Sequence, residues 1–324
     1  MTAPEVTEKA NFNNSLAEQG YLKVLKSVNT NEPKNYWQWK KIVWFGTSIP
    51  CGTPDNNYPE IVADRLGAIV YNEAIGGSSV RCGIGNNATD DDPLGYRGRN
   101  FYNVALSLCG TIEEKRDIID NLSKYSSIMV DVPSSLSDKE KERILSCSYE
   151  NKLDKYLSGG EVGQVDLYVF DHGYNDNNSW NISSNDLLEM PNDKYDRRWF
   201  RSGMNFLINR FLEDNPHARI CFIGHYQSDR IETSNTYKAQ KLVQEQWGFP
   251  IFETWNHMGI TENRIKTTGY WDNGIWIESG GNEQSLSMRE LYFADGLHPY
   301  SDASGNATMK YAEVLTPFFI NNVR

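Results

Sequence analysis

The chain lacks the features that mark membrane proteins and nucleic-acid-binding proteins. No apolar run approaches the ~20 residues that a membrane-spanning helix needs, and the longest runs, such as residues 42–45, have the length of a strand. The 32 Lys and Arg are outnumbered by 43 Asp and Glu, which gives a formal net charge of −11. An acidic chain repels phosphate backbones and anionic lipid surfaces. We therefore expect no nucleic-acid partner and no insertion into a membrane.

Cysteine is also scarce, and its spacing predicts no metal site. The five cysteines form no CxxC pair and no cluster with His, which disfavours both zinc and a disulfide framework; they are Cys51, Cys82, Cys109, Cys147 and Cys221. We expect reduced thiols, no metal and no cofactor. Residues 1–10 lack the basic and apolar regions of a signal peptide. A cytoplasmic location is the default expectation, and a cell-surface or virion-associated location is the alternative.

What is present is the composition of a globular protein that is rich in aromatic residues. Hydrophobic residues make up 39% of the chain and charged residues 23%, a balance that excludes global disorder. Aromatic residues reach 12%, with 9 Trp and 18 Tyr. Such a content suits a protein that stacks on sugar rings, and it is equally compatible with one large, well-packed domain.

Short apolar runs alternate with helical patterns along most of the chain. The runs that predict strands buried on both faces are 42–45, 68–71, 165–170, 219–223 and 250–252. The patterns that predict helices are 58–66, 112–122, 139–156, 197–213, 236–247 and 304–320. This alternation predicts a flavodoxin-like three-layer α/β/α sandwich with a five-stranded, mainly parallel sheet.

The same pattern divides the chain into an extension and one domain. Residues 1–38 are polar and rich in Asn and predict an N-terminal extension with one short helix at 15–27, and residues 39–324 form the predicted α/β domain. Three segments inside this domain break the alternation and are rich in polar residues and Gly: 81–102, 180–196 and 255–291. They follow or flank the ends of strands, where long loops usually build a substrate site.

Two short motifs follow the first two predicted strands. Ser48 closes the sequence Gly46-Thr47-Ser48 and would stand exposed at the carboxyl edge of the sheet, where ligands of such folds bind. The pair Gly76 and Gly77 follows the second strand, and glycines let backbone N–H groups approach a ligand closely. Taken alone, each motif is equally compatible with a turn or a helix cap.

Two further motifs lie later in the chain. Asn175 follows Gly173 after the third predicted strand, where its amide can donate into a site or close a turn with Asp176. Asp295 and His298 precede the last predicted helix, three residues apart, so that the carboxylate can orient the imidazole. A lone pair of this kind is also compatible with a surface His.

Taken together and in this order, the four motifs resemble the sequence blocks of the SGNH hydrolase superfamily, also called the GDSL esterase/lipase family. The resemblance covers nearly all of the predicted domain. It implies that Ser48 is the nucleophile, that His298 is the general base and acid, and that Asp295 orients His298. It also implies an oxyanion hole made by the backbone N–H groups of Ser48 and Gly77 and by the side chain of Asn175.

Two details qualify this resemblance. Thr47 stands where the first block usually has Asp, so the chain departs from the family there. That Asp is not the nucleophile, and the chemistry does not require it. Pro50 occupies the place of the last Gly in a Gly-x-Ser-x-Gly elbow, which argues against an α/β-hydrolase.

The resemblance predicts a serine esterase that cleaves carboxylic esters through an acyl-enzyme. The polar insertions and the absence of an apolar lid favour short acyl groups, such as acetyl, on a carbohydrate. A lipase or lysophospholipase of the same fold is one alternative, and a non-catalytic glycan-binding module is another. Side chains that could line the substrate site, but that could equally pack in the core, are His172, His225, Trp180, Trp255 and Trp271.

Overall fold

The computed structural model describes the chain in segments. The described residues are 35–52, 56–76, 78–81, 105, 116, 162–178, 188–196, 199–224, 235–259, 265–266, 270–272, 275–277, 286–287, 292–293, 297–299 and 307–323. By its internal contacts the chain divides into Met1–Gln38 and Trp39–Arg324, and the sheet lies in the second unit. The helices predicted at 15–27 and 139–156, and nearly all of the one at 112–122, fall outside the described residues.

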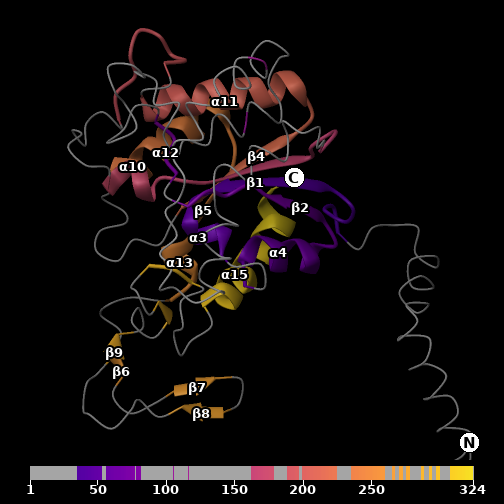
Figure 1. The fold of residues 1–324 in the computed structure, drawn as a ribbon, viewed down its shortest axis with the longest axis vertical. Helices are drawn as coiled ribbons and strands as arrows, with labels where there is room; N and C mark the ends of the chain where they lie inside the picture. Colours follow the sequence, from indigo (N-terminus) through magenta and orange to yellow (C-terminus); the bar gives the residue numbers. More distant parts are fainter. Residues whose placement is uncertain are drawn as a thin grey trace, which may run out of the picture. The chain divides into compact units, whose positions relative to one another are not determined.

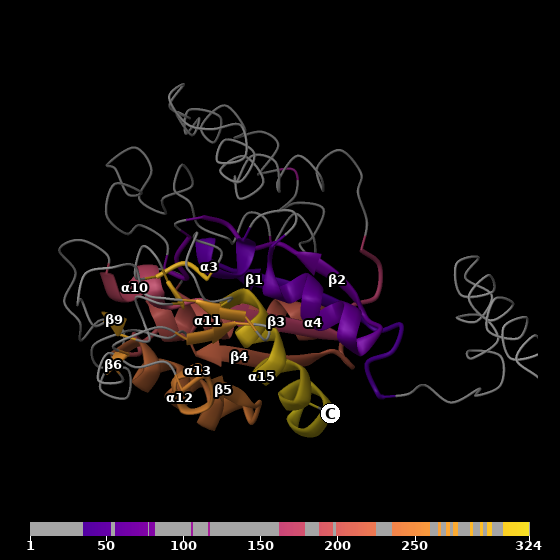
Figure 2. The same cartoon turned by 90° about the horizontal axis from the view of Figure 1, so that it is seen from below.

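Five strands form the central sheet, and each corresponds to one predicted apolar run. They are β1 (Lys41–Gly46), β2 (Ile69–Asn72), β3 (Leu167–Asp171), β4 (Arg219–Gly224) and β5 (Ile251–Glu253). Their order is β2-β1-β3-β4-β5, and all four neighbouring pairs are parallel. Figure 2 shows these strands side by side. The flavodoxin-like fold class is confirmed, and the strand order reverses between β1 and β3, where such folds bind ligands.

Helices cover both faces of the sheet (Figure 1). The longer ones are α4 (Tyr58–Leu66), α11 (Phe200–Asp214), α12 (Asn235–Trp247) and α15 (Ala307–Asn322). Three short helices begin at or just beyond the carboxyl ends of β1, β3 and β5: α3 (Ser48–Cys51), α10 (Tyr174–Asn178) and α13 (Thr254–His257). None of the helices in the described part of the chain is long and apolar enough to cross a membrane.

Residues of β1 join the two helical layers to the sheet. Phe45 stacks on Phe211 of α11, with 5.3 Å between ring centroids. Trp44, the preceding residue, stacks on Phe319 of α15 at 5.5 Å. Successive side chains of a strand point to opposite faces, so these neighbours bury rings on both sides. This double burial explains why the strands appear in the sequence as continuous apolar runs.

Local signals place the ends of α4 where the sequence predicts them. The side chain of Asn57 accepts a hydrogen bond from the Glu60 amide at 3.0 Å, and Pro59 stands in the first turn. Gly67 ends the helix in the left-handed conformation with φ of 67°. Such caps are encoded within a few residues, so the sequence alone suffices to locate them.

The segment 255–291 is more structured than the sequence analysis expected. Beyond α13 it contains two short antiparallel pairs, β6 (Ile265–Lys266) with β9 (Leu286–Ser287) and β7 (Tyr270–Asp272) with β8 (Ile275–Ile277). The chain between β7 and β8 reads Asn-Gly, which is a strong hairpin signal that the prediction of a loop overlooked.

The expectation of reduced thiols is wrong for one cysteine. Cys51, the last residue of α3, is disulfide-bonded, and its partner lies outside the described residues. Cys221 of β4 is a buried free thiol. Burial raises the pKa of this thiol, and the Asp171 carboxylate adds to the effect. Cysteine pairing depends on distances in the fold, which spacing along the sequence does not give.

Candidate active site

Ser48 stands at the start of α3, directly beyond the carboxyl end of β1. The preceding Thr47 is the helix cap, and its side chain accepts a hydrogen bond from the Ile49 amide at 3.3 Å. Gly46 permits the sharp turn, because a Cβ there would lie 2.2 Å from Cγ of Pro50. Ser48 is half-buried, and its backbone N–H has no acceptor among the described residues. Thr47, which departs from the family pattern, therefore supplies the acceptor that begins this helix.

His298 faces Ser48 from the far end of the chain. Its Nε2 lies 2.8 Å from Oγ of Ser48, although the two residues are 250 positions apart. The following Pro299 is buried, and its carbonyl accepts a hydrogen bond from the Thr308 hydroxyl in α15 at 3.2 Å. The last helix thus anchors the loop that carries His298. Asp295 lies outside the described residues, so its proposed role as the orienting carboxylate stays a prediction.

The segment after β2 is bonded to β1 and α3. The Ile75 amide donates to the Gly46 carbonyl at 2.9 Å, and the Asn72 side-chain amide donates to the Pro50 carbonyl at 3.0 Å. These bonds join the second sequence block to the turn that presents Ser48. Gly77 itself lies outside the described residues, and its role in an oxyanion hole stays a prediction.

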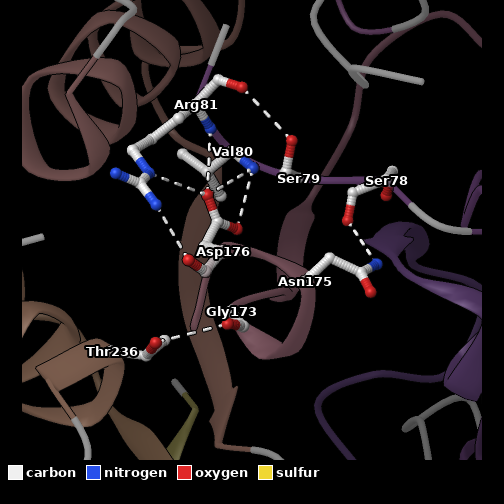
Figure 3. A network of polar contacts seen from close by, with 8 residues as sticks. All are labelled: Ser78, Ser79, Val80, Arg81, Gly173, Asn175, Asp176 and Thr236. Atoms are coloured by element: carbon white, nitrogen blue, oxygen red, sulfur yellow. Dashed lines mark hydrogen bonds and ion pairs between the residues drawn. The ribbon is translucent and has the colours of Figure 1, made fainter. Parts of the chain in front are cut away.

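Asn175 lies in α10, directly after the end of β3. It is half-buried, and its Nδ2 donates a hydrogen bond to the Ser78 carbonyl at 2.7 Å (Figure 3). A side-chain amide carries two N–H groups, and no acceptor for the second one appears among the described residues. Gly173 adopts φ of 128°, and a Cβ there would meet Cγ2 of Thr236 at 2.3 Å, so only glycine fits this turn.

A buried ion pair fixes the segment 78–81 to α10, and the sequence analysis missed it. The Asp176 carboxylate accepts hydrogen bonds from the amides of Val80 and Arg81 at 2.9 and 3.1 Å. Nη2 of Arg81 donates to the Asp176 carbonyl at 2.8 Å (Figure 3). Burial raises the pKa of the Asp176 carboxyl, and Arg81 with the two amides acts against that shift. This contact joins the segment after β2 to the helix α10 that follows β3.

A second buried carboxylate lies beneath the turn at Gly46. Oδ2 of Asp171 accepts hydrogen bonds from Nε1 of Trp44 at 3.0 Å and from the Tyr58 hydroxyl at 2.5 Å. Burial, together with the charge of Asp171, raises the pKa of the Tyr58 phenol, which keeps it protonated as a donor. Asp171 therefore connects β1, β3 and α4, and in the sheet it is paired with Gly46, two residues before Ser48. The sequence offered no signal for this network, because its members come from three separate segments.

The structure describes the side chains of His172 and Trp255, and their role in lining a substrate site stays a prediction. His172 is only 1% exposed, and its Nε2 lies 3.0 Å from Oγ of Ser78, so it packs behind the second block. Trp255 is half-buried, with its ring 4.9 Å from that of Tyr237 and close to Gly224. Trp180, His225 and the side chain of Trp271 lie outside the described part of the chain.

The arrangement as a whole can activate a hydroxyl nucleophile. A serine hydroxyl lies within hydrogen-bond reach of an imidazole, and donors from the Ser48 backbone and the Asn175 side chain lie on the same edge of the sheet. In the described residues no three His, Cys, Asp or Glu side chains come together as metal ligands would. A hydroxyl beside an imidazole, with N–H donors at the same edge of the sheet, is the kind of arrangement that acyl transfer uses.

Comparison with known proteins finds likeness to solved structures of low sequence identity. No family model and no curated protein matches the chain. A possible lipase from Chitinophaga pinensis DSM 2588 is 12% identical, with 86% of this chain and 97% of that one covered and a TM-score of 0.41. An acetyl xylan esterase from the rumen bacterium Butyrivibrio proteoclasticus is 14% identical, with 88% of this chain and 64% of that one covered and a TM-score of 0.40.

A third similar structure is a carbohydrate esterase family 2 enzyme with a carbohydrate binding domain, from Corynascus thermopiles (Myceliophthora fergusii). It is 14% identical, with 88% of this chain and 67% of that one covered and a TM-score of 0.39. By name these neighbours are esterases and a possible lipase, the kinds of enzyme that the sequence resemblance implies. At this distance they carry no argument about function, which rests on the geometry of the site.

Proposed function

We propose that the chain is a serine esterase that hydrolyses carboxylic esters through an acyl-enzyme intermediate. The observation that carries this proposal is the 2.8 Å contact between Oγ of Ser48 and Nε2 of His298. A nucleophile and a base within hydrogen-bond reach are the minimum that covalent ester hydrolysis requires. Their position beyond β1, beside the point where the strand order reverses, is where this fold binds its ligands.

In the proposed first half-reaction, Oγ of Ser48 attacks the ester carbonyl carbon while Nε2 of His298 takes the hydroxyl proton. The carbonyl electron pair moves to oxygen, and its return expels the alcohol, which receives the proton from Nε2. Water then attacks the acyl-enzyme in the same way, with His298 again as base and then as acid. For Nε2 to accept a proton, the neutral ring must carry its hydrogen on Nδ1, the atom that Asp295 is proposed to face.

The negative charge that develops on the carbonyl oxygen needs donors that are already in place. The proposed donors are the backbone N–H groups of Ser48 and Gly77 and the second N–H of Asn175. The Ser48 amide is available because Thr47 caps the next amide, that of Ile49, and leaves the first one open. Donors arranged before the reaction stabilise the transition state without reorganisation.

The substrate class is proposed from the composition of the insertions. The segments 81–102 and 180–196 are polar, and the chain is rich in Trp and Tyr. A long acyl chain would need an apolar groove, whereas a sugar needs polar partners and aromatic faces. We therefore assign short-chain esters, acetyl above all, carried on a carbohydrate. The lipase and the non-catalytic glycan-binding module are the outcomes that the following experiment would reveal instead.

Two measurements test the proposal. A fluorophosphonate probe should label the wild-type protein at Ser48, as mapped by peptide mass spectrometry, and should not label Ser48→Ala. In a series of p-nitrophenyl esters, kcat/KM should be highest for acetyl and butyryl and should fall for decanoyl. A maximum at long chains would indicate a lipase. Absence of both labelling and turnover, with retained binding of a glycan, would indicate a binding module.

A further inference from the structure

Ser78 joins three segments of the site although the sequence analysis assigned it no role. Its side chain is 0% exposed. Its Oγ donates a hydrogen bond to the Gly46 carbonyl at 2.9 Å and lies 3.0 Å from Nε2 of His172. Its carbonyl accepts the hydrogen bond from Asn175 at 2.7 Å (Figure 3). One residue thus contacts the strand that precedes the nucleophile and the side chain proposed to bind the oxyanion.

The positions of the hydrogens in this network follow from the donor inventory. A serine hydroxyl has one hydrogen, and the Gly46 carbonyl can only accept, so the hydrogen of Ser78 points to Gly46. At the other contact Oγ of Ser78 must therefore accept, and Nε2 of His172 must carry a hydrogen and donate it. His172 in this way fixes the rotation of the Ser78 hydroxyl toward β1.

We propose that Ser78 is a positioning residue for the oxyanion donors, and that His172 holds it in place. This inference rests on the esterase function proposed above. Ser78 follows Gly77, so its bond to Gly46 determines where the second block lies relative to Ser48. Its carbonyl also aims the Asn175 amide. Because displacements of about 1 Å can cost as much as 10²-fold in rate, these bonds act on turnover.

The carboxyl end of β4 offers a matched control. There the Thr254 hydroxyl donates to the Gly224 carbonyl at 2.6 Å, and Thr254 is also 0% exposed. The contact is again a buried hydroxyl bonded to the carbonyl of a strand-ending glycine. It involves neither His172 nor Asn175 and lies two strands away from β1. Removing either hydroxyl therefore removes the same kind of bond, but only Ser78 contacts the proposed machinery.

The experiment compares Ser78→Ala with Thr254→Val in the full chain, with p-nitrophenyl acetate as substrate. We expect Ser78→Ala to lower kcat about 10- to 100-fold with KM unchanged, because a misplacement of about 1 Å can cost as much as 10²-fold in rate. The rate of fluorophosphonate labelling at Ser48 should fall in parallel. Thr254→Val should lower the melting temperature about as much as Ser78→Ala does, but it should leave kcat unchanged.

Substitutions of His172 give an independent test, which also serves if Ser78→Ala fails to fold. The side-chain amide of Gln reaches about as far as Nε2 of His, so His172→Gln retains a donor for Ser78 and should keep most of the wild-type kcat. His172→Leu removes the donor and should lower kcat as Ser78→Ala does. The double variant Ser78→Ala/His172→Leu should be no slower than the slower single variant. Both substitutions act through the same Ser78 hydroxyl, so their effects should not add.

Each outcome decides the question. If the wild type is active, and Ser78→Ala keeps its kcat but loses stability as Thr254→Val does, then Ser78 has only a structural role. That result overturns the inference and leaves the proposed esterase function unaffected. Equal losses of kcat in His172→Gln and His172→Leu would equally contradict the role of the Nε2 donor. If the wild type is neither labelled at Ser48 nor active, the proposed function fails and this inference fails with it.

Discussion

The ends of β1 and β4 are built in the same way but differ in what they present. Each strand ends in a glycine, Gly46 or Gly224. The carbonyl of this glycine accepts a hydrogen bond from a buried hydroxyl of another segment. Each glycine lacks room for a Cβ. At β1 the chain turns into α3 and presents Ser48 to His298. At β4 the space beside the glycine is filled by the ring of Trp255.

This difference shows that the backbone arrangement at a strand end does not by itself make a site. Both ends satisfy the last carbonyl and bury the turn. Among the described residues, the end of β1 combines a half-buried hydroxyl with an imidazole, and the end of β4 does not. The chemistry therefore lies in side chains that long-range contacts bring to this edge.

The largest effect on kcat is expected from substitutions that remove the reactive groups at the end of β1. Ser48→Ala should lower kcat by about 10⁴- to 10⁶-fold, and His298→Ala should be comparably damaging, because the two act as a unit. Ser48 is half-buried, and within the described part of the chain its side chain makes one hydrogen bond, so the melting temperature should barely change. Steady-state kinetics and calorimetry of both variants check this expectation. An active Ser48→Ala protein would refute the nucleophile assignment.

Asn175→Ala tests whether the third block is chemical or structural. Loss of one oxyanion donor typically costs on the order of 10²–10³ in kcat, or ~2.7–4 kcal/mol, and acts on kcat more than on KM. Asn175→Asp is the matched variant, since it keeps the size of the side chain and removes both N–H groups. If instead kcat is retained and only the melting temperature falls, Asn175 serves as a structural clamp on Ser78.

Substitution of the two strand-ending glycines tests directly whether the ends of β1 and β4 differ in function. A Cβ on Gly46 would lie 2.2 Å from Pro50, so Gly46→Ala should displace α3 and lower both activity and stability. A Cβ on Gly224 would lie 2.8 Å from the ring of Trp255. Gly224→Ala should cost about 1–3 kcal/mol of stability, as overpacking does, and leave kcat unchanged. Equal loss of kcat in both variants would contradict the separation of the two ends.

The smallest expected effect concerns the cap of α3. The Thr47 hydroxyl accepts a hydrogen bond from the Ile49 amide, whereas Glu253, which precedes α13, makes no side-chain cap bond. Thr47→Ala should therefore cost about 1 kcal/mol of unfolding free energy, measured by denaturant titration. Thr47→Asp introduces the residue that is usual at this place in the SGNH sequence blocks and keeps an acceptor at the cap, so it should retain the stability. A faster Thr47→Asp enzyme would mean that Thr47 limits the rate.

The sheet was predictable because its signals are local. The apolar run at β1, the caps of α4 and the glycines that end the strands each lie within a few residues of the feature they determine. The hairpin at β7 and β8 had such a signal in its Asn-Gly turn, and it was overlooked. The roles of Ser78 and Arg81 had none, because each depends on partners about 95 residues away.

By itself the sequence determined the strands, most of the helix positions and the residue types at the carboxyl edge of the sheet. Periodicity, turn residues and caps act over short distances, and they specify these features wherever the segment lies. Only the tertiary structure decided that Ser48 and His298 lie 2.8 Å apart, that Nε2 of His172 lies 3.0 Å from Oγ of Ser78, and that Cys51 forms a disulfide. These pairings are set by how the layers pack, because residues far apart in the chain meet only when the sheet and its helices have assembled.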